Sequence, residues 1–373
     1  MKLRFTIAVS TLCLALTGLP ALAGDPQGVA GAIYTMTNDP AGNAVVAYER
    51  LADGSLRYED LYPTGGLGSG GGLGNQGGIV LSDNGRWLLV VNAGSDEISV
   101  FAVSGSGLSL VDTAPSGGVL PVSIAIHNRL AYVVHAGGSV GDVDSIFGFR
   151  LAGDGTLHPV PGSDRSLGAP NTGPAQIGFS PDGRFLIVTE KATNYIDVFP
   201  VQKDGTTGPL VSNPSVGQTP FAFAFGKRDQ LFVSEVSGGA QDAGAVSSYQ
   251  LGSDGYLEIL DGSIANTETA PCWLVVTKGG RYVFTTNTPD DSLSAYSVEF
   301  NGQLTLVDED GRTGEPGPGT RPLDMDLSDD GRFLYTLNIG DDTISTFRVL
   351  PDGSLSHLEA VAGVAGANGL AAR

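Results

Sequence analysis

Seven polar residues recur at intervals of about fifty residues, and each follows a short apolar run. They are Asn38, Asn92, His135, Glu190, Glu235, Asn287 and Asn338. Three of these positions are not asparagine, and their side chains can accept or donate a proton. An imidazole titrates near neutrality, and a carboxyl group in a partly dry site has a raised pKa. His135, Glu190 and Glu235 are therefore the candidate catalytic acids and bases. The alternative is that such residues only cap strand ends and form turns.

Further polar, cationic and aromatic side chains are candidates for substrate binding. They are Asn38, Asn92, Gln176, Asn287, Asn338, Arg321 and Trp273. Arg321 and Lys191 carry charges that polarise a carbonyl group or hold a carboxylate. Cys272 is either a small buried residue or, with a base beside it, a nucleophile. No cofactor is required, but Ca²⁺ accepts carboxylate and amide oxygens from different loops, so the polar ring is an alternative calcium site.

A repeated unit must position these residues, and it runs through the whole chain. Its clearest copies are residues 175–186 and 323–334, which share the pattern Ser-x-Asp-Gly-Arg-Phe-Leu. A later apolar run in each unit ends in an aromatic residue, 47 to 53 residues after the previous one: Tyr48, Phe101, Phe149, Phe199, Tyr249, Tyr296 and Phe347. Asp-Gly or Asn-Gly pairs then mark tight hairpins. Seven such units predict an all-β fold, a seven-bladed β-propeller with four-stranded blades.

The two ends of the chain indicate how the ring closes. The first unit begins directly with its second strand, residues 33–37, and its missing innermost strand matches residues 369–372. A closed ring has no exposed sheet edges, whereas an open solenoid, the alternative, needs caps. The ends of the second strands should then meet at one mouth of the axial channel, where converging polar groups are the default site. The glycine-rich residues 65–78 are expected to form a long loop into the second unit.

The first residues indicate export. Lys2 and Arg4 precede an apolar stretch over residues 5–19 and the small-residue site Ala21-Leu22-Ala23. This is the layout of a signal peptide that covers residues 1–23. A membrane anchor is the alternative, but the stretch is shorter than the roughly 20 residues that a span needs. We expect a periplasmic or secreted protein whose single domain covers residues 24–373.

The composition of residues 24–373 excludes several classes of partner and site. They hold 18 basic and 40 acidic residues, a formal net charge of −22, which disfavours nucleic acids and anionic membranes. Cys272 is their only thiol, so no intramolecular disulfide can form. We expect a monomer without a membrane span, which binds a small molecule, a protein or a glycan at the channel mouth.

The repeat also carries a family resemblance. The Ser-Pro-Asp-Gly-Arg-Phe-Leu segment, the Asn after the second run, and the closing Asp-Gly-x-Leu turn resemble the lactonase-type seven-bladed propellers. That family includes 6-phosphogluconolactonases and carboxymuconate cyclase-like proteins. Its enzymes present His and Arg residues just after the proline that opens each innermost strand. Here no His occupies those places, and the nearest basic residue is Arg321, just before Pro322. The resemblance implies the fold, but a sugar-phosphate substrate would want cationic clamps that are missing.

Two functions remain open from the sequence. The first is hydrolysis of a lactone or small ester, with His135, Glu190 and Glu235 in the acid–base or metal-holding roles. The second is a non-catalytic propeller that binds a protein, a glycan or a small ligand, because this fold serves many unrelated roles.

Overall fold

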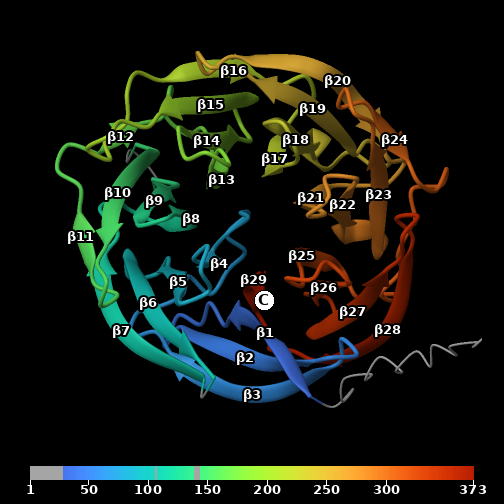
Figure 1. Ribbon diagram of the computed structural model, residues 1–373, viewed down its shortest axis with the longest axis horizontal. Coiled ribbons are helices and arrows are strands. Elements are labelled where there is room, and N and C mark those ends of the chain that lie inside the picture. Colours follow the sequence, from blue (N-terminus) through green and yellow to red (C-terminus); the bar gives the residue numbers. More distant parts are fainter. Residues whose placement is uncertain (1–27, 106, 138–142) are drawn as a thin grey trace, which may run out of the picture.

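Seven antiparallel sheets stand around a central axis in the computed structural model, which describes residues 28–105, 107–137 and 143–373 (Figure 1). Each sheet has four main strands, and one has a short fifth strand. This confirms the predicted seven-bladed β-propeller. Within the described ranges, the helical segments are two 3-10 turns, η1 (Ser237–Gly239) and η2 (Thr288–Asp290). No helix of this part of the chain is long and apolar enough to cross a membrane. The expected signal peptide lies outside the described residues.

The strands follow one order in every blade, from the channel outward. The innermost strands are β29 (Asn368–Ala372), β4 (Ile79–Leu81), β8 (Pro121–His127), β13 (Pro174–Phe179), β17 (Pro220–Phe225), β21 (Pro271–Val276) and β25 (Pro322–Leu327). The second strands are β1 (Val29–Met36), β5 (Trp87–Asn92), β9 (Leu130–His135), β14 (Phe185–Glu190), β18 (Gln230–Glu235), β22 (Tyr282–Asn287) and β26 (Phe333–Asn338). The third strands are β2 (Ala44–Leu51), β6 (Glu97–Ser104), β10 (Ser145–Leu151), β15 (Tyr195–Pro200), β19 (Ala245–Leu251), β23 (Ser292–Val298) and β27 (Thr343–Val349). The outermost strands are β3 (Leu56–Pro63), β7 (Gly107–Pro115), β11 (Leu157–Pro159) with the short β12 (Arg165–Ser166), β16 (Val211–Pro214), β20 (Leu257–Ala265), β24 (Leu304–Leu306) and β28 (Leu355–Ala362).

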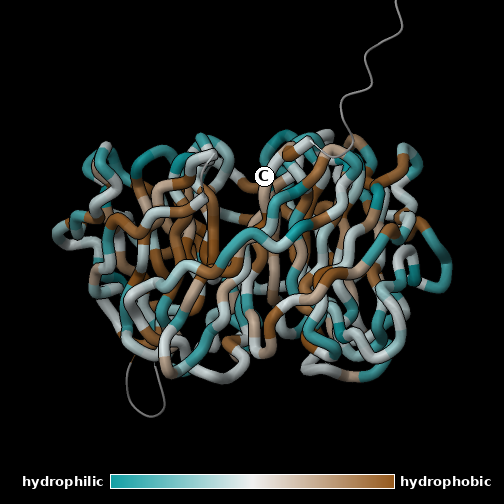
Figure 2. The backbone as a smooth tube through the Cα atoms, turned by 90° about the horizontal axis from the view of Figure 1, so that it is seen from below, coloured by the Kyte–Doolittle hydropathy of each residue, from teal (hydrophilic) through white to brown (hydrophobic). Residues whose placement is uncertain are grey.

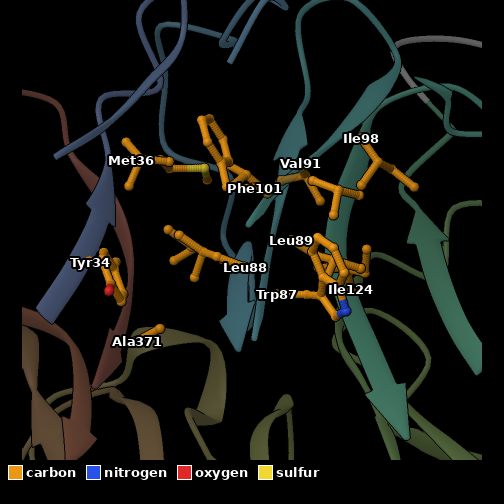
Figure 3. Close-up of a cluster of buried hydrophobic side chains, with 14 of the residues drawn as sticks. Tyr34, Met36, Trp87, Leu88, Leu89, Val91, Ile98, Phe101, Ile124 and Ala371 are labelled. Carbon is orange, nitrogen blue, oxygen red and sulfur yellow. The ribbon is translucent and has the colours of Figure 1, made fainter. Parts of the chain in front are cut away.

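The core lies between neighbouring blades. The seven aromatic residues that end the third apolar runs are all at most 1% exposed, so the sequence pattern marked core positions. One cluster joins three consecutive blades, with Tyr34 and Met36 on β1, Leu88 on β5 and Ile124 on β8 (Figure 3). In side view, apolar segments fill the body of the disc and hydrophilic loops gather at its rims (Figure 2). Each blade thus buries its faces against its neighbours.

The Asp-Gly turns need glycine for two reasons. Gly54 has φ 98° and Gly353 has φ 89°, in the region that side chains other than hydrogen disfavour. A Cβ on Gly54 would also overlap the ring of Phe333, and one on Gly353 would overlap Tyr282. These outer hairpins therefore pack against the blade before them, and the predicted turn chemistry is confirmed.

Ring closure follows the predicted pairing of the two chain ends. β29 pairs with β1 in antiparallel register, with Ala372 opposite Ile33 and Ala371 opposite Tyr34. Carboxylates on the innermost strand of the adjacent blade hold the same strand. Asp324 accepts a hydrogen bond from the Gly369 N–H, and Asp326 accepts one from the Ala372 N–H at 2.8 Å.

Candidate functional site

The seven residues of the predicted polar ring end or follow the second strands, and all are at most 3% exposed. Three asparagines donate to a serine seven residues later on the third strand of the same blade. The pairs are Asn92 with Ser99, Asn287 with Ser294 and Asn338 with Ser345, each at 2.8 Å. Asn38 instead binds the glycine-rich loop through Ser69 and Gly71. These amides therefore tie strands and loops together, as the capping alternative expected.

Three members of the ring can accept or donate a proton, and they lie in three different blades: His135, Glu190 and Glu235. Glu235 accepts hydrogen bonds from the Gly217 N–H at 2.9 Å and from the hydroxyls of Ser247 and Ser263, each at 2.5 Å. Nε2 of His135 lies 3.0 Å from the Ser116 hydroxyl, and burial lowers the pKa of His135 to about 4. A neutral imidazole is therefore expected at physiological pH.

Glu190 forms a different arrangement in its blade. It accepts a hydrogen bond from the Thr193 hydroxyl and faces the buried Asp197. Burial, and then the contact with Asp197, raise the pKa of Glu190 to about 8. We interpret the two carboxyl groups as sharing one proton, because two adjacent buried charges would repel each other. In the blade of His135, the loop backbone at Gly118 packs directly against the imidazole, since a Cβ on Gly118 would lie 2.6 Å from the His135 ring.

The glycine-rich loop crosses the axial channel on the side of the polar ring. The backbone N–H of Gln76 donates to Ala175 O at 2.9 Å, and its side chain pairs with the backbone of Leu274 at 3.0 and 3.2 Å. Asn75 donates to Val122 O, and Lys191 donates to Gly74 O. The segment is a long loop into the second blade, as predicted, and it also bridges blades across the ring.

Lys191 and Cys272 lie near this crossing. The Lys191 ammonium stands 5.1 Å from the centre of the Phe221 ring, and burial lowers the pKa of Lys191 to about 8. Burial raises the pKa of the Cys272 thiol, so a thiolate is disfavoured at neutral pH. Arg321 is exposed on the same side of the molecule and has φ 54°.

A cavity of about 710 Å³ occupies the channel beyond the crossing. Gln76 and Gly77 stand at one end of it. Its other end reaches the turns between the innermost and second strands, with Asp83, Asn84 and Asp329. The cavity therefore opens on the face opposite the polar ring. None of the seven ring residues lines it, whereas the predicted substrate-binding residues Gln176 and Trp273 do.

Three aspartates line this cavity, and Asp326 is the one that lies on an innermost strand. It stands on β25 among apolar wall residues that include Ile79, Val275 and Met325. Its oxygens accept the N–H groups of Ala372 and Leu327, each at 2.8 Å. Burial outweighs these two hydrogen bonds and raises the pKa of Asp326 from 3.8 to about 7. An ionisable group in a concave apolar site with such a pKa is a functional candidate.

Asp326 is not among the residues predicted from the sequence, although the repeat contained a signal. In five of the other six innermost strands, the aligned position carries a small or apolar residue: Val80, Ala125, Gly178, Ala224 and Val275. An aspartate in that row breaks the pattern, as His135 does among the asparagines. The row was not singled out because only the strand register shows which residues face the channel.

The described residues contain no group of three or more His, Cys, Asp or Glu that could hold a metal ion. Glu235 is engaged by a backbone N–H and two hydroxyls, and Glu190 by Thr193 and Asp197. The calcium site remains a prediction from the sequence.

Comparison with known proteins agrees with the architecture. The family model described as a seven-bladed β-propeller lactonase matches residues 42–160, 153–235 and 228–369. A 6-phosphogluconolactonase of Serratia proteamaculans is 24% identical over 278 residues, which cover 72% of this chain and 78% of that protein. The periplasmic gluconolactonase of Pseudomonas aeruginosa superimposes with a TM-score of 0.70 at 19% identity and covers 92% of this chain and 98% of its own. A Lactobacillus plantarum protein gives a TM-score of 0.71 at 17% identity, with 92% and 99% coverage.

Proposed function

Since the chain belongs to the family of seven-bladed β-propeller lactonases, we propose that it hydrolyses a lactone or related small ester inside the axial cavity. The observation that carries this proposal is the Asp326 carboxyl group on an innermost strand that lines a cavity of about 710 Å³. Burial raises its pKa to about 7, which suits a general base at neutral pH.

The proposed reaction uses Asp326 twice. The ionised carboxylate takes a proton from a water molecule while the water oxygen bonds to the lactone carbonyl carbon. Negative charge moves onto the carbonyl oxygen. When the carbonyl re-forms, the ring C–O bond breaks, and the protonated Asp326 returns its proton to the leaving alkoxide. The product is the open-chain hydroxy acid.

Arg373 is the proposed donor to the carbonyl oxygen. It lines the same cavity, and its Nε is buried without a hydrogen-bond partner. It directly follows Ala372, whose N–H donates to Asp326, so the closing strand holds both residues. A cationic N–H donor beside the reacting carbonyl stabilises the negative charge that develops on its oxygen during ester hydrolysis.

We also propose that the protein acts outside the cytoplasm as a monomer. The basic start, apolar stretch and small-residue site of residues 1–23 support export.

The function is tested by measuring kcat/KM of the chain from Gly24 onward on five- and six-membered lactones. Asp326→Asn should lower kcat/KM at least about 100-fold, because proton transfer contributes that much in enzymes. The amide keeps an oxygen acceptor for the closing strand, and the melting temperature verifies folding. Asp342→Asn is the matched control, since Asp342 is exposed in the same blade and its φ of 56° suits asparagine.

Two outcomes would contradict the proposal. A fully active Asp326→Asn variant would remove this residue from the reaction. A wild-type protein that hydrolyses no lactone would favour the non-catalytic propeller that binds a protein, a glycan or a small ligand.

A further inference from the structure

A second hollow of about 450 Å³ adjoins the axial cavity on the same face of the ring. The two share Asp83, Ile126 and Gln176 in their linings, so they form one continuous concave surface. We call the second hollow the aromatic groove, because Phe179, Phe223 and Phe225 line it. It runs past the ends of the innermost strands β8, β13 and β17.

The groove is held open by hydrogen bonds and small residues. The Gln176 side chain pairs with the backbone of Phe223, at 2.6 and 3.0 Å, and so fixes β13 beside β17. Gly178 and Ala224 also line the groove. A Cβ added to Gly178 would lie 2.8 Å from the Phe223 ring. A larger side chain at either position would therefore reduce the space.

The charges around this surface disfavour anions. The described residues that line the groove include no Lys or Arg, and their one histidine, His127, lies 3.9 Å from the carboxylate of Asp83. Arg373 is the one Lys or Arg among the residues that line the cavity. The cavity lining includes the carboxyl groups of Asp83, Asp326 and Asp329. Anionic substrates such as sugar phosphates need cationic side chains that bind the phosphate. One guanidinium beside three carboxyl groups binds a phosphate weakly, because the carboxylates repel it. The rings of Phe179, Phe223 and Phe225 favour an apolar group beside them, because its contact with them removes apolar surface from water.

We infer that the site takes an uncharged lactone that carries an apolar or aromatic substituent. The ring occupies the cavity between Asp326 and Arg373, and the substituent lies in the aromatic groove. This inference rests on the proposed function, because it assigns the substrate class of the same reaction.

The kinetic test compares lactones of one ring size with side chains of one to eight carbons, an unsubstituted sugar lactone and a phosphorylated sugar lactone. Each CH₂ group that enters the groove should raise kcat/KM about fourfold, until the groove is full. Ala224→Leu should remove most of that gain, because the leucine occupies the groove. Ala360→Leu makes the same change at an exposed position of β28 and should keep the gain.

The second measurement is independent of turnover. Calorimetry with the matching lactams, which resist hydrolysis, should show affinity rising with chain length in the wild type and not in Ala224→Leu. Phe225→Ala should flatten the dependence too, because it removes an aromatic wall. If lactam affinity does not change with chain length, or if the phosphorylated lactone is preferred, the groove assignment is wrong. If the lactams bind with the expected chain dependence but no lactone is hydrolysed, the groove stands and the proposed function fails.

Discussion

The chemistry proposed for this protein depends on one aspartate whose environment differs from that of the other carboxylates. The turn aspartates Asp53 and Asp352 have lowered pKa values because a nearby serine donates to each. Asp326 also accepts two N–H groups, yet burial dominates and its pKa rises to about 7. The difference arises from position, since the turns lie at the outer rim and Asp326 faces the channel.

The pH profile should report this group. The ionised form of Asp326 is the active base, so kcat/KM should fall about tenfold per pH unit below 7 and level off above it. Asp329 contributes to the raised pKa of Asp326 through its negative charge. Asp329→Asn should therefore move the midpoint of the profile to lower pH. A wild-type profile that is flat between pH 5 and pH 8 would contradict the assignment.

Part of this site could be predicted from the sequence, and part could not. The repeat identified Gln176 and Trp273 near the channel because prolines mark the start of five of the seven innermost strands. The ring residues were correctly placed at strand ends, but strand-end position does not tell whether a side chain faces the channel or the blade. The prediction that His135, Glu190 and Glu235 are catalytic remains untested by this geometry, which gives each a buried partner.

At the scale of elements, the joint between the second and third strands differs among the blades. Three blades join the strands through an asparagine and a serine seven residues apart. The blade of β14 and β15 has Glu190 and Asp197 at the same spacing. A shared proton can replace the amide donor there, because a protonated carboxyl group donates as an amide does.

The pair of carboxyl groups on Glu190 and Asp197 makes the free energy of unfolding depend on pH. The pKa of Glu190 is about 8 in the folded protein and about 4.5 when the chain is exposed, so the folded state holds a proton that the unfolded state releases between these values. Stability from this group should therefore fall as pH rises from 4.5 to 8. Glu190→Gln keeps a donor toward Asp197 and does not titrate. Relative to wild type, the variant should gain on the order of 4 kcal/mol between pH 5 and pH 9.

Chemical denaturation at several pH values measures that gain. Glu258→Gln serves as a control, because it makes the same change on an exposed outer strand. A difference between Glu190→Gln and wild type that stays constant with pH would show that the pair does not share a proton.

At the scale of the whole molecule, the sequence was informative about architecture because the repeat is local. Turn residues and strand-ending aromatics lie within single units, and both were confirmed. The strand missing from the first unit was found at the other end of the chain because every other unit contains its own copy. The direction in which the cavity opens depends on Gln76, which contacts Leu274 across 198 residues of sequence. No local pattern predicts that contact, and so the accessible face of the channel could not be predicted.

The most direct test of the account is the crystal structure of the protein with a bound lactam that carries an apolar side chain. We expect density for the lactam ring in the axial cavity, with its carbonyl oxygen toward Arg373 and with Asp326 beside the carbonyl carbon. Density for the side chain should follow the aromatic groove toward Phe225. A lactam bound instead on the opposite face, beside His135 and Glu190, would contradict the assignment of the site and restore the polar ring as the reaction centre.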